Sequence, residues 1–297
     1  MEPEERIQAA SKFLLQSPPG EINDVLNDVR NIISDDESLQ AGVLPALREY
    51  NLQQFITATV PGRQHQCIVS EASRVPPGTE GEEEDSEDRF WDPRSRTSFK
   101  FDHLTLDAKD PQPYEPEAES EPFRTALETS TLSYLSAHFH SGVGSVFPTH
   151  GKPNRFVVQL VTNKYNPSNF WSGRWRSEYI VDLEARTLEG KILVNVHYYE
   201  QGNVQLATSH TISLDLPSGI SPSNESAAAS KILALIDAEE TKYQTSLNES
   251  YQEMGDNLFK GLRRALPMTR AKLDWDKVLG YKLGAELAGG KGGFGSS

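Results

Sequence analysis

Residues 204–216 read VQLATSHTISLDL, and this stretch decides the fold class. Two sets of residues alternate along it, so that Val204, Leu206, Thr208, His210, Ile212 and Leu214 interleave with Gln205, Ala207, Ser209, Thr211, Ser213 and Asp215. A period of two places the first, more apolar set on one face of a β-strand. One buried and one solvated face is typical of antiparallel sheets. We therefore predict an antiparallel strand at 204–216.

The residues before this strand predict the rest of a sheet. Gln201-Gly202-Asn203 has the length of a hairpin loop and a glycine for positive φ. Ser172-Gly173-Arg174 is interpreted as a second tight turn between two short strands. The predicted strands are Phe156–Thr162, Asn169–Trp171, Trp175–Val181 and Ile192–Glu200. We expect an antiparallel meander of four or five strands, with no βαβ unit.

One long helix is predicted after the sheet, over residues 221–266. Ser221 can cap it, Pro222 suits its first position, and Pro267 ends it. Its apolar stripe is Ile232, Leu235, Ile236, Tyr243, Leu247, Met254, Leu258 and Leu262. At 1.5 Å per residue the helix would be roughly 68 Å long. We expect it to cross a sheet larger than this chain provides; the alternative is two helices that break near Gly255.

The N-terminal half is predicted to hold a helical region and a small β region. Residues 1–50 favour three helices, at Pro3–Leu15, at Ile22–Ile33 and from Ser38 to about Tyr50. Residues 51–122 favour short strands at Gln53–Val60, Gln66–Ser70 and Ser98–Leu106, an acidic loop at 76–90, and a connector at Asp110–Pro122. Residues 123–220 then hold a helix at Leu127–His140 and the antiparallel sheet. The fold class is α+β.

Composition favours a soluble cytosolic protein. The 297 residues carry 29 basic and 43 acidic side chains, a net charge of −14. Such acidity argues against nucleic-acid or anionic-membrane binding over the whole surface. The only cysteine, Cys67, excludes a disulfide within this chain. No apolar stretch approaches the ~20 residues that span a bilayer.

The charge is unevenly distributed. Seven acids and no base lie between Glu80 and Asp88, whereas Leu258–Leu283 carries seven bases against two acids. The basic segment overlaps residues 267–288, which we predict to be a mobile amphipathic arm, followed by a flexible tail at 289–297. The short helix expected at Leu273–Leu287 is marginal alone in water. Such an arm is typical of a helix that binds in a partner's groove.

No set of residues predicts catalysis. The seven histidines are scattered, and Cys67 lies in an apolar run typical of a buried, inert thiol. Gly142-Val143-Gly144 lacks the third glycine of a dinucleotide-binding loop. The acids of Glu80–Asp88 are too crowded and too solvated for a general acid and base pair. We therefore expect no enzymatic activity, no cofactor and no metal site.

Three segments resemble the α subunit of F-actin capping protein. They are NFWSGRWRS at 169–177, VHYYEQGNVQL at 196–206 and FKGLRRALPMTRAKLDWDK at 259–277. The order of helices, small strands, meander, long helix and basic arm agrees with that family over nearly the whole chain. The acidic loop at 80–88 and the glycine-rich tail depart from the family pattern.

The resemblance implies an obligate heterodimer. The family's α subunit shares one continuous sheet with a β subunit, under two antiparallel long helices. The dimer binds barbed ends of actin filaments independently of Ca²⁺ and blocks subunit exchange without severing, in the cytoplasm and the cortical actin cytoskeleton. Phosphoinositides and capping-protein regulators are further partners that the family suggests.

The resemblance also implies roles for particular residues. The actin contacts carry over to Lys260, Arg264 and Arg270, with Arg263 and Lys272 as auxiliaries. The apolar side chains would either hold the arm against the body of the dimer or become buried on actin; they are Leu273, Trp275 and Leu279. The subunit interface is expected at Tyr198, Tyr199, Val204, Leu206, Ile236, Tyr243 and Leu247. The alternative function is a phosphoinositide- or RNA-binding module that uses the same basic arm.

Overall fold

The computed structural model describes residues 3–33, 36–76, 88–139, 141–200 and 203–254. The chain divides into one unit of residues 1–243 and a second unit of residues 244–297. Only residues 244–254 of the second unit are described. None of the described helices is long and apolar enough to cross a membrane.

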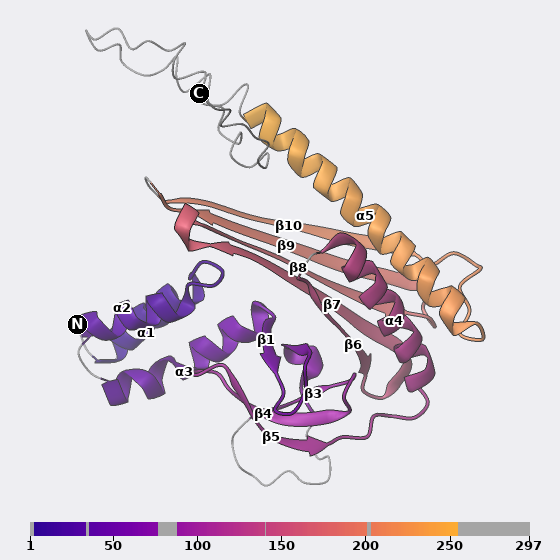
Figure 1. The fold of residues 1–297 in the computed structure, drawn as a ribbon, viewed down its shortest axis with the longest axis horizontal. Coiled ribbons are helices and arrows are strands. Elements are labelled where there is room, and N and C mark those ends of the chain that lie inside the picture. The colour runs from indigo at the N-terminus through magenta and orange to yellow at the C-terminus, as the bar shows by residue number, and fades with distance from the viewer. Residues whose placement is uncertain (1–2, 34–35, 77–87, 140, 201–202, 255–297) are drawn as a thin grey trace, which may run out of the picture. The chain divides into compact units, whose positions relative to one another are not determined.

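The first unit contains a five-stranded antiparallel meander, as the alternation predicted. The order is β10-β9-β8-β7-β6, so each strand pairs with its neighbour in sequence (Figure 1). The strands are β6 (Val143–Thr149), β7 (Lys152–Asn166), β8 (Trp171–Asp182), β9 (Thr187–Tyr198) and β10 (Val204–Asp215). The first of them, β6, was not predicted. Its first two residues, Val143 and Gly144, belong to Gly142-Val143-Gly144, which was compared with a dinucleotide-binding loop and not with a strand.

The predicted turn at Ser172-Gly173-Arg174 is wrong. Strand β8 runs through Gly173, which pairs with Lys164 of β7 and with Val196 of β9. The turn lies earlier, at the 3₁₀ segment Pro167–Asn169. A glycine flanked on both sides by paired strands keeps its place in the ladder, so its presence alone did not mark a turn.

Two helices lie on one face of this sheet (Figure 1). Helix α4 (Glu121–His138) begins six residues before the predicted Leu127. Helix α5 (Glu225–Glu253) begins later than predicted, because the side-chain oxygen of Asn224, not Ser221, accepts a hydrogen bond from the Ala227 amide at 3.4 Å. The predicted extension to Leu266 and the alternative break near Gly255 lie outside the described residues.

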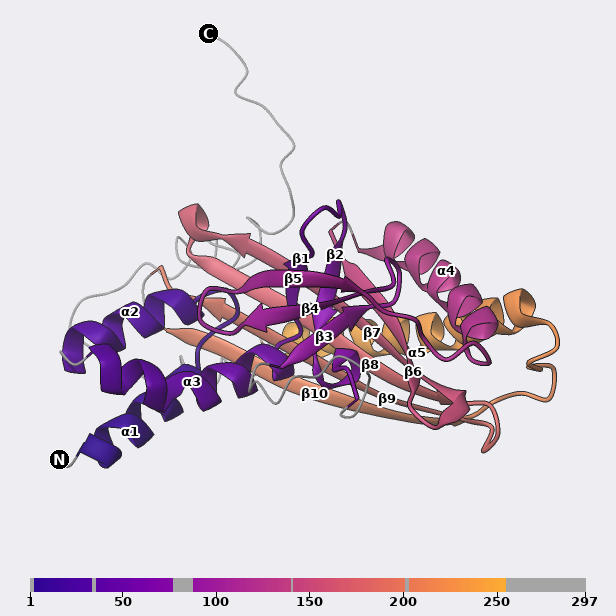
Figure 2. The same ribbon diagram turned by 90° about the horizontal axis from the view of Figure 1, so that it is seen from below.

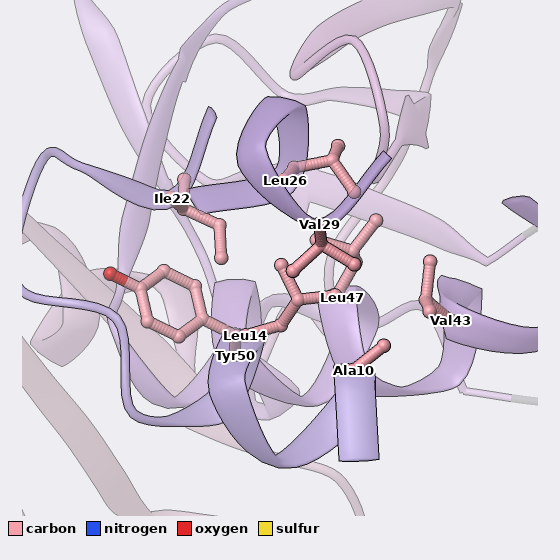
Figure 3. Close-up of a cluster of buried hydrophobic side chains, with 8 residues drawn as sticks. All are labelled: Ala10, Leu14, Ile22, Leu26, Val29, Val43, Leu47 and Tyr50. Atoms are coloured by element: carbon pink, nitrogen blue, oxygen red, sulfur yellow. The ribbon is translucent and has the colours of Figure 1, made fainter. Parts of the chain in front are cut away.

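The N-terminal half lies on the opposite face (Figure 2). Helices α1 (Pro3–Leu15), α2 (Ile22–Ile33) and α3 (Asp36–Gln53) confirm the predicted helical region, although α3 begins before Ser38 and extends past Tyr50. Their side chains converge on one apolar cluster (Figure 3), formed by Ala10, Leu14, Ile22, Leu26, Val29, Val43, Leu47 and Tyr50.

Two small sheets follow α3. One pairs β1 (Ile56–Thr59) with β2 (Gln66–Val69), and the other has the order β3 (Arg89–Asp92), β4 (Thr97–Asp102) and β5 (Asp107–Pro113). The predicted connector at Asp110–Pro122 is therefore wrong at its start. Two prolines fit β5 because it is an edge strand.

The other boundaries of this β region also differ from the prediction. The first strand starts at Ile56 because α3 continues through Gln53. The predicted strand to Leu106 stops at Asp102, whose side chain accepts hydrogen bonds from the Leu104 and Thr105 amides at 2.9 and 3.1 Å and forms a turn. The predicted loop at 76–90 is wrong at its end, because β3 begins at Arg89, and residues 77–87 lie outside the described ranges.

Close packing of α4 on β6 depends on glycine. A Cβ added at Gly144 would lie 2.5 Å from a methyl carbon of Leu135 and 3.2 Å from that of Thr131, both on α4. No side chain fits such a space without displacing the helix. The glycine pair that resembled a nucleotide loop therefore serves helix packing.

We predict that Gly144→Ala lowers the free energy of unfolding by roughly 1–3 kcal/mol, because the methyl group overpacks the helix–sheet contact. Urea unfolding of the full chain measures this. The matched control is Gly173→Ala in β8, where the nearest atoms to an added Cβ are 3.9 Å away. Equal unfolding midpoints for the two variants would refute the packing argument.

Candidate functional site

All predicted actin-binding residues lie outside the described residues. These are Lys260, Arg263, Arg264, Arg270, Lys272, Leu273, Trp275 and Leu279. The described part of the site therefore consists of β8 with the residues packed on its two faces, of α5, and of the exposed end of β9 and β10.

Strand β8 is central to this part of the structure because side chains on both of its faces are buried. Ser172, Arg174 and Arg176 are buried on the side of the N-terminal helices. Residues Ser177 and Tyr179 are buried on the side of α4 and α5. The segment that carries the family resemblance thus contacts both helical layers.

The two arginines bind the C-terminal end of α3. The Arg176 guanidinium donates to the carbonyl oxygen of Gln53, and that of Arg174 donates to the Gln54 carbonyl at 3.3 Å. Each also donates to an asparagine of a neighbouring strand, at 2.6 Å for Asn163 and 2.7 Å for Asn195. Cations are favourable here because the last carbonyls of a helix lack partners and carry partial negative charge.

Burial affects the charge of both arginines. It lowers the pKa of Arg174, and it lowers the pKa of Arg176 to about 10, where the neighbouring Arg174 charge adds to the effect. With a pKa of about 10, Arg176 remains protonated at neutral pH. No carboxylate is bonded to either arginine in the part of the chain that the structure describes. The cost of burying the two guanidinium groups is therefore offset by hydrogen bonds to backbone carbonyl and side-chain amide oxygens.

A second polar junction joins α2 to the sheet. The Glu21 carboxylate, just before α2, lies 2.8 Å from Nδ1 of His197 and accepts a hydrogen bond from the Ser172 hydroxyl at 3.1 Å. The Tyr199 ring stacks on the His197 ring, with centroids 4.9 Å apart. This junction fixes the end of β8 and β9 relative to the N-terminal helices.

On the other face, Tyr243 of α5 contacts β8 and β10. Its ring stacks on His210 with centroids 4.7 Å apart, and its hydroxyl lies 3.1 Å from the Thr208 hydroxyl. Ile236, two turns earlier on α5, is fully buried. Ile236 and Tyr243 thus belong to this chain's own core, and Leu247, half-buried, lies in the second unit.

An exposed apolar row ends the sheet beside the β9–β10 hairpin. Trp171, Tyr198 and Val204 are paired across β8, β9 and β10. Tyr198 is 39% exposed and Val204 64% exposed. Val196 and Leu206 form the next pair on this face, two residues further along each strand. Strand β10 is also an edge strand, which has no second neighbour among the described strands.

The sequence did not single out the polar residues that anchor β8. Arg176 lay in the predicted strand Trp175–Val181, whereas Arg174 was assigned to the predicted turn. Their spacing of two residues, with no acid at the neighbouring positions of that face before Glu178, was the signal that could have identified them. Glu240 was also missed, although it lies four residues after Ile236, on the apolar stripe of the predicted helix. A carboxylate on such a stripe indicates a buried polar contact.

The chain is similar to proteins of one family along almost its whole length. The family model described as F-actin capping protein alpha subunit matches residues 10–286. The protein named F-actin-capping protein subunit alpha from Neurospora crassa is 39% identical over 287 residues, covering 95% of this chain and 97% of that protein. The protein of the same name from Caenorhabditis elegans is 37% identical over 290 residues, covering 95% and 97%.

A solved structure shares the fold. It is described as the homodimeric actin capping protein alpha subunit from Plasmodium berghei. It aligns with a TM-score of 0.71 at 20% identity, covering 90% of this chain and 99% of that one. At this identity the likeness concerns the fold alone.

We predict that Arg176→Ala lowers the free energy of unfolding by about 1–3 kcal/mol, because the Gln53 carbonyl and the Asn195 oxygen lose a buried donor. Hydrogen exchange should also rise in the last turn of α3. Urea unfolding and mass-resolved exchange measure the two effects. The control is Arg94→Ala at an exposed arginine; exchange in α3 that does not differ between the variants would contradict the anchoring role.

Proposed function

The chain belongs to the family of F-actin capping protein alpha subunits, and we propose that it pairs with a beta subunit to cap the barbed ends of actin filaments. The single observation that carries this proposal is the match to the family model over residues 10–286, which includes the basic arm. We further propose that capping is independent of Ca²⁺ and blocks subunit exchange without severing.

The proposed interface with the beta subunit is the exposed end of β9 and β10. A twelve-residue edge strand with apolar neighbours is a hazard in a chain that acts alone, because it can pair with any exposed strand. A partner strand alongside β10 would satisfy its outer backbone groups. It would also bring apolar surface to Tyr198, Val204 and Leu206, and Tyr199 and Leu247 would lie at the margin. Ile236 and Tyr243 would contribute by holding α5 in place.

The proposed actin contact is the basic arm. The segment 258–283 carries a charge of +5 on a chain of net charge −14, which favours an acidic partner. Lys260, Arg264 and Arg270, assisted by Arg263 and Lys272, would orient the encounter with actin. Exposed ion pairs contribute only ~0–1 kcal/mol each, so most of the affinity would come from apolar contacts of Leu273, Trp275 and Leu279.

This function requires no reaction, so we propose neither enzymatic activity nor a cofactor. The chain would act in the cytoplasm, on the actin cytoskeleton and its cortical structures. Phosphoinositides and capping-protein regulators would modulate the dimer, not define it. The alternative, a phosphoinositide- or RNA-binding module, predicts binding through the arm without a beta subunit.

We predict that the chain co-expressed with a capping-protein beta subunit stops elongation from actin seeds at substoichiometric concentration. Truncation after Asn257 should abolish capping and leave the dimer intact, because the proposed actin contacts all follow Asn257, whereas the proposed subunit interface precedes it. Pyrene-actin elongation with free barbed ends, with and without EGTA, measures this. Continued growth in the presence of an intact full-length dimer would refute capping, and arm-dependent binding to acidic vesicles or RNA without the beta chain would establish the alternative.

We also predict that Val204→Lys with Leu206→Glu weakens the heterodimer by at least tenfold in dissociation constant, since charges would replace an apolar contact. Analytical ultracentrifugation of the purified dimer on dilution measures this. The matched control is Glu189→Lys, an exposed residue of β9 on the other face of the sheet. Equal dimer stability in the two variants would place the interface elsewhere.

A further inference from the structure

A carboxylate is buried at the centre of the contact between α5 and the sheet. Glu240 is 0% exposed. Its Oε1 accepts hydrogen bonds from the Ser177 hydroxyl at 2.8 Å and from the Tyr179 hydroxyl at 2.5 Å. Its Oε2 accepts one from the Tyr134 hydroxyl at 2.5 Å. Three elements, β8, α4 and α5, therefore meet at one side chain.

Burial of the Glu240 carboxylate would be unfavourable if its three hydroxyl donors were not in place. A buried carboxylate without partners costs several kcal/mol, and no lysine or arginine is bonded to Glu240 in the described ranges. The three hydroxyl donors thus carry the whole compensation. Moving α5 by one residue along its axis would shift Glu240 by about 1.5 Å and rotate it by about 100°. Such a shift would break all three bonds.

Tyr243, the last buried residue of this helix face, makes one more directional contact, with the Thr208 hydroxyl at 3.1 Å. The other buried contacts of this face are less selective. They come from the apolar side chains Ala228, Ala229, Ile232, Leu233 and Ile236, which are all buried. Apolar contacts are non-directional, so such a stripe can pack in more than one register. The directional bonds of Glu240 distinguish between registers, as a buried polar residue does in a coiled coil.

The donors are themselves fixed in place. A Cβ at Gly190 would lie 2.5 Å from the Tyr179 ring, so the glycine makes room for that ring beside its cross-strand partner. The Tyr134 ring stacks on His138 with centroids 4.5 Å apart, and His138 lies 3.7 Å from the Asp237 carboxylate of α5. The site is therefore preorganised from both the sheet and α4.

The two tyrosines keep their protons. Burial, together with the Glu240 charge, raises the pKa of Tyr134 and of Tyr179 above its ordinary value. Both hydroxyls consequently remain donors at neutral pH.

We propose that Glu240 is a positioning residue that sets the axial register of α5 on the sheet. The register of the helix fixes the point from which the chain continues toward the arm. Glu240 would thereby act on capping without touching actin. The effect on capping rests on the proposed function, whereas the effect on register does not.

The test measures a distance across this contact. Spin labels at Ala238→Cys on α5 and Ser213→Cys on β10 report the register in the full-length chain, since both sites are exposed. Cys67 is buried, and burial raises the pKa of its thiol, so it does not compete for label. The variants are Glu240→Leu, which removes every acceptor, and Glu240→Gln, which keeps the volume and one acceptor oxygen.

The matched control is Ile236→Ala, one helical turn away and also fully buried. We expect Glu240→Leu to broaden or shift the distance distribution, Glu240→Gln to do so less, and Ile236→Ala to keep the native distribution despite a lower urea midpoint. If Glu240→Leu does not fold, Tyr134→Phe with Tyr179→Phe replaces it, with the same expectation. Native distributions in all acceptor and donor variants, or an equal change in Ile236→Ala, overturn the proposal.

Elongation assays of the dimer then test the consequence. We expect Glu240→Gln to slow barbed-end association severalfold while the dimer stays intact. A changed distance distribution with unchanged capping would confine Glu240 to helix register and refute its action on capping. If the wild-type dimer itself does not cap, the proposed function fails, and the distance measurement still decides the register.

Discussion

Buried hydrogen-bonding groups on both faces of β8 determine how the two helical layers are placed. On one face Arg174 and Arg176 bind the last carbonyls of α3, and on the other Ser177 and Tyr179 bind Glu240 of α5. Each group loses its water on folding, so each requires a partner in a defined position. Apolar packing supplies most of the stability of such a domain. The buried hydrogen bonds determine which arrangement of the helices on the sheet is adopted.

The same sheet has an edge strand, β10, whose outer side is unpaired among the described strands. Its outermost strand β10 pairs only with β9 within the described residues, and the row of Trp171, Tyr198 and Val204 crosses three strands beside the hairpin. A subunit of an obligate dimer can retain such a surface because its partner covers it. The unpaired edge of β10 is therefore consistent with the proposed pairing with a beta subunit.

Much of this architecture could be predicted from the sequence. Alternation at 204–216 was sufficient for β10, and the 3.6-residue period was sufficient for α2 and α5. The errors arose where tertiary contacts override local signals. Gly173 resembles a turn but is held in the ladder by strands on both sides, and the prolines of β5 resemble a linker but lie on a sheet edge. Glu240 could not be assigned in advance, because its hydroxyl donors are 61 to 106 residues away in sequence. The arm residues from Lys260 to Leu279 remain predictions.

The buried side chains of α5 lie between Ala228 and Tyr243, and we propose that a beta subunit covers the described residues that follow. Residues 225–243 include the buried contacts, whereas residues 244–253 are exposed except for the half-buried Leu247. Hydrogen exchange along α5, in the chain alone and with a beta subunit, tests this directly. The account predicts protection of residues 225–243 in both samples and of residues 244–253 only in the dimer. Equal protection of the whole helix in the chain alone would contradict it.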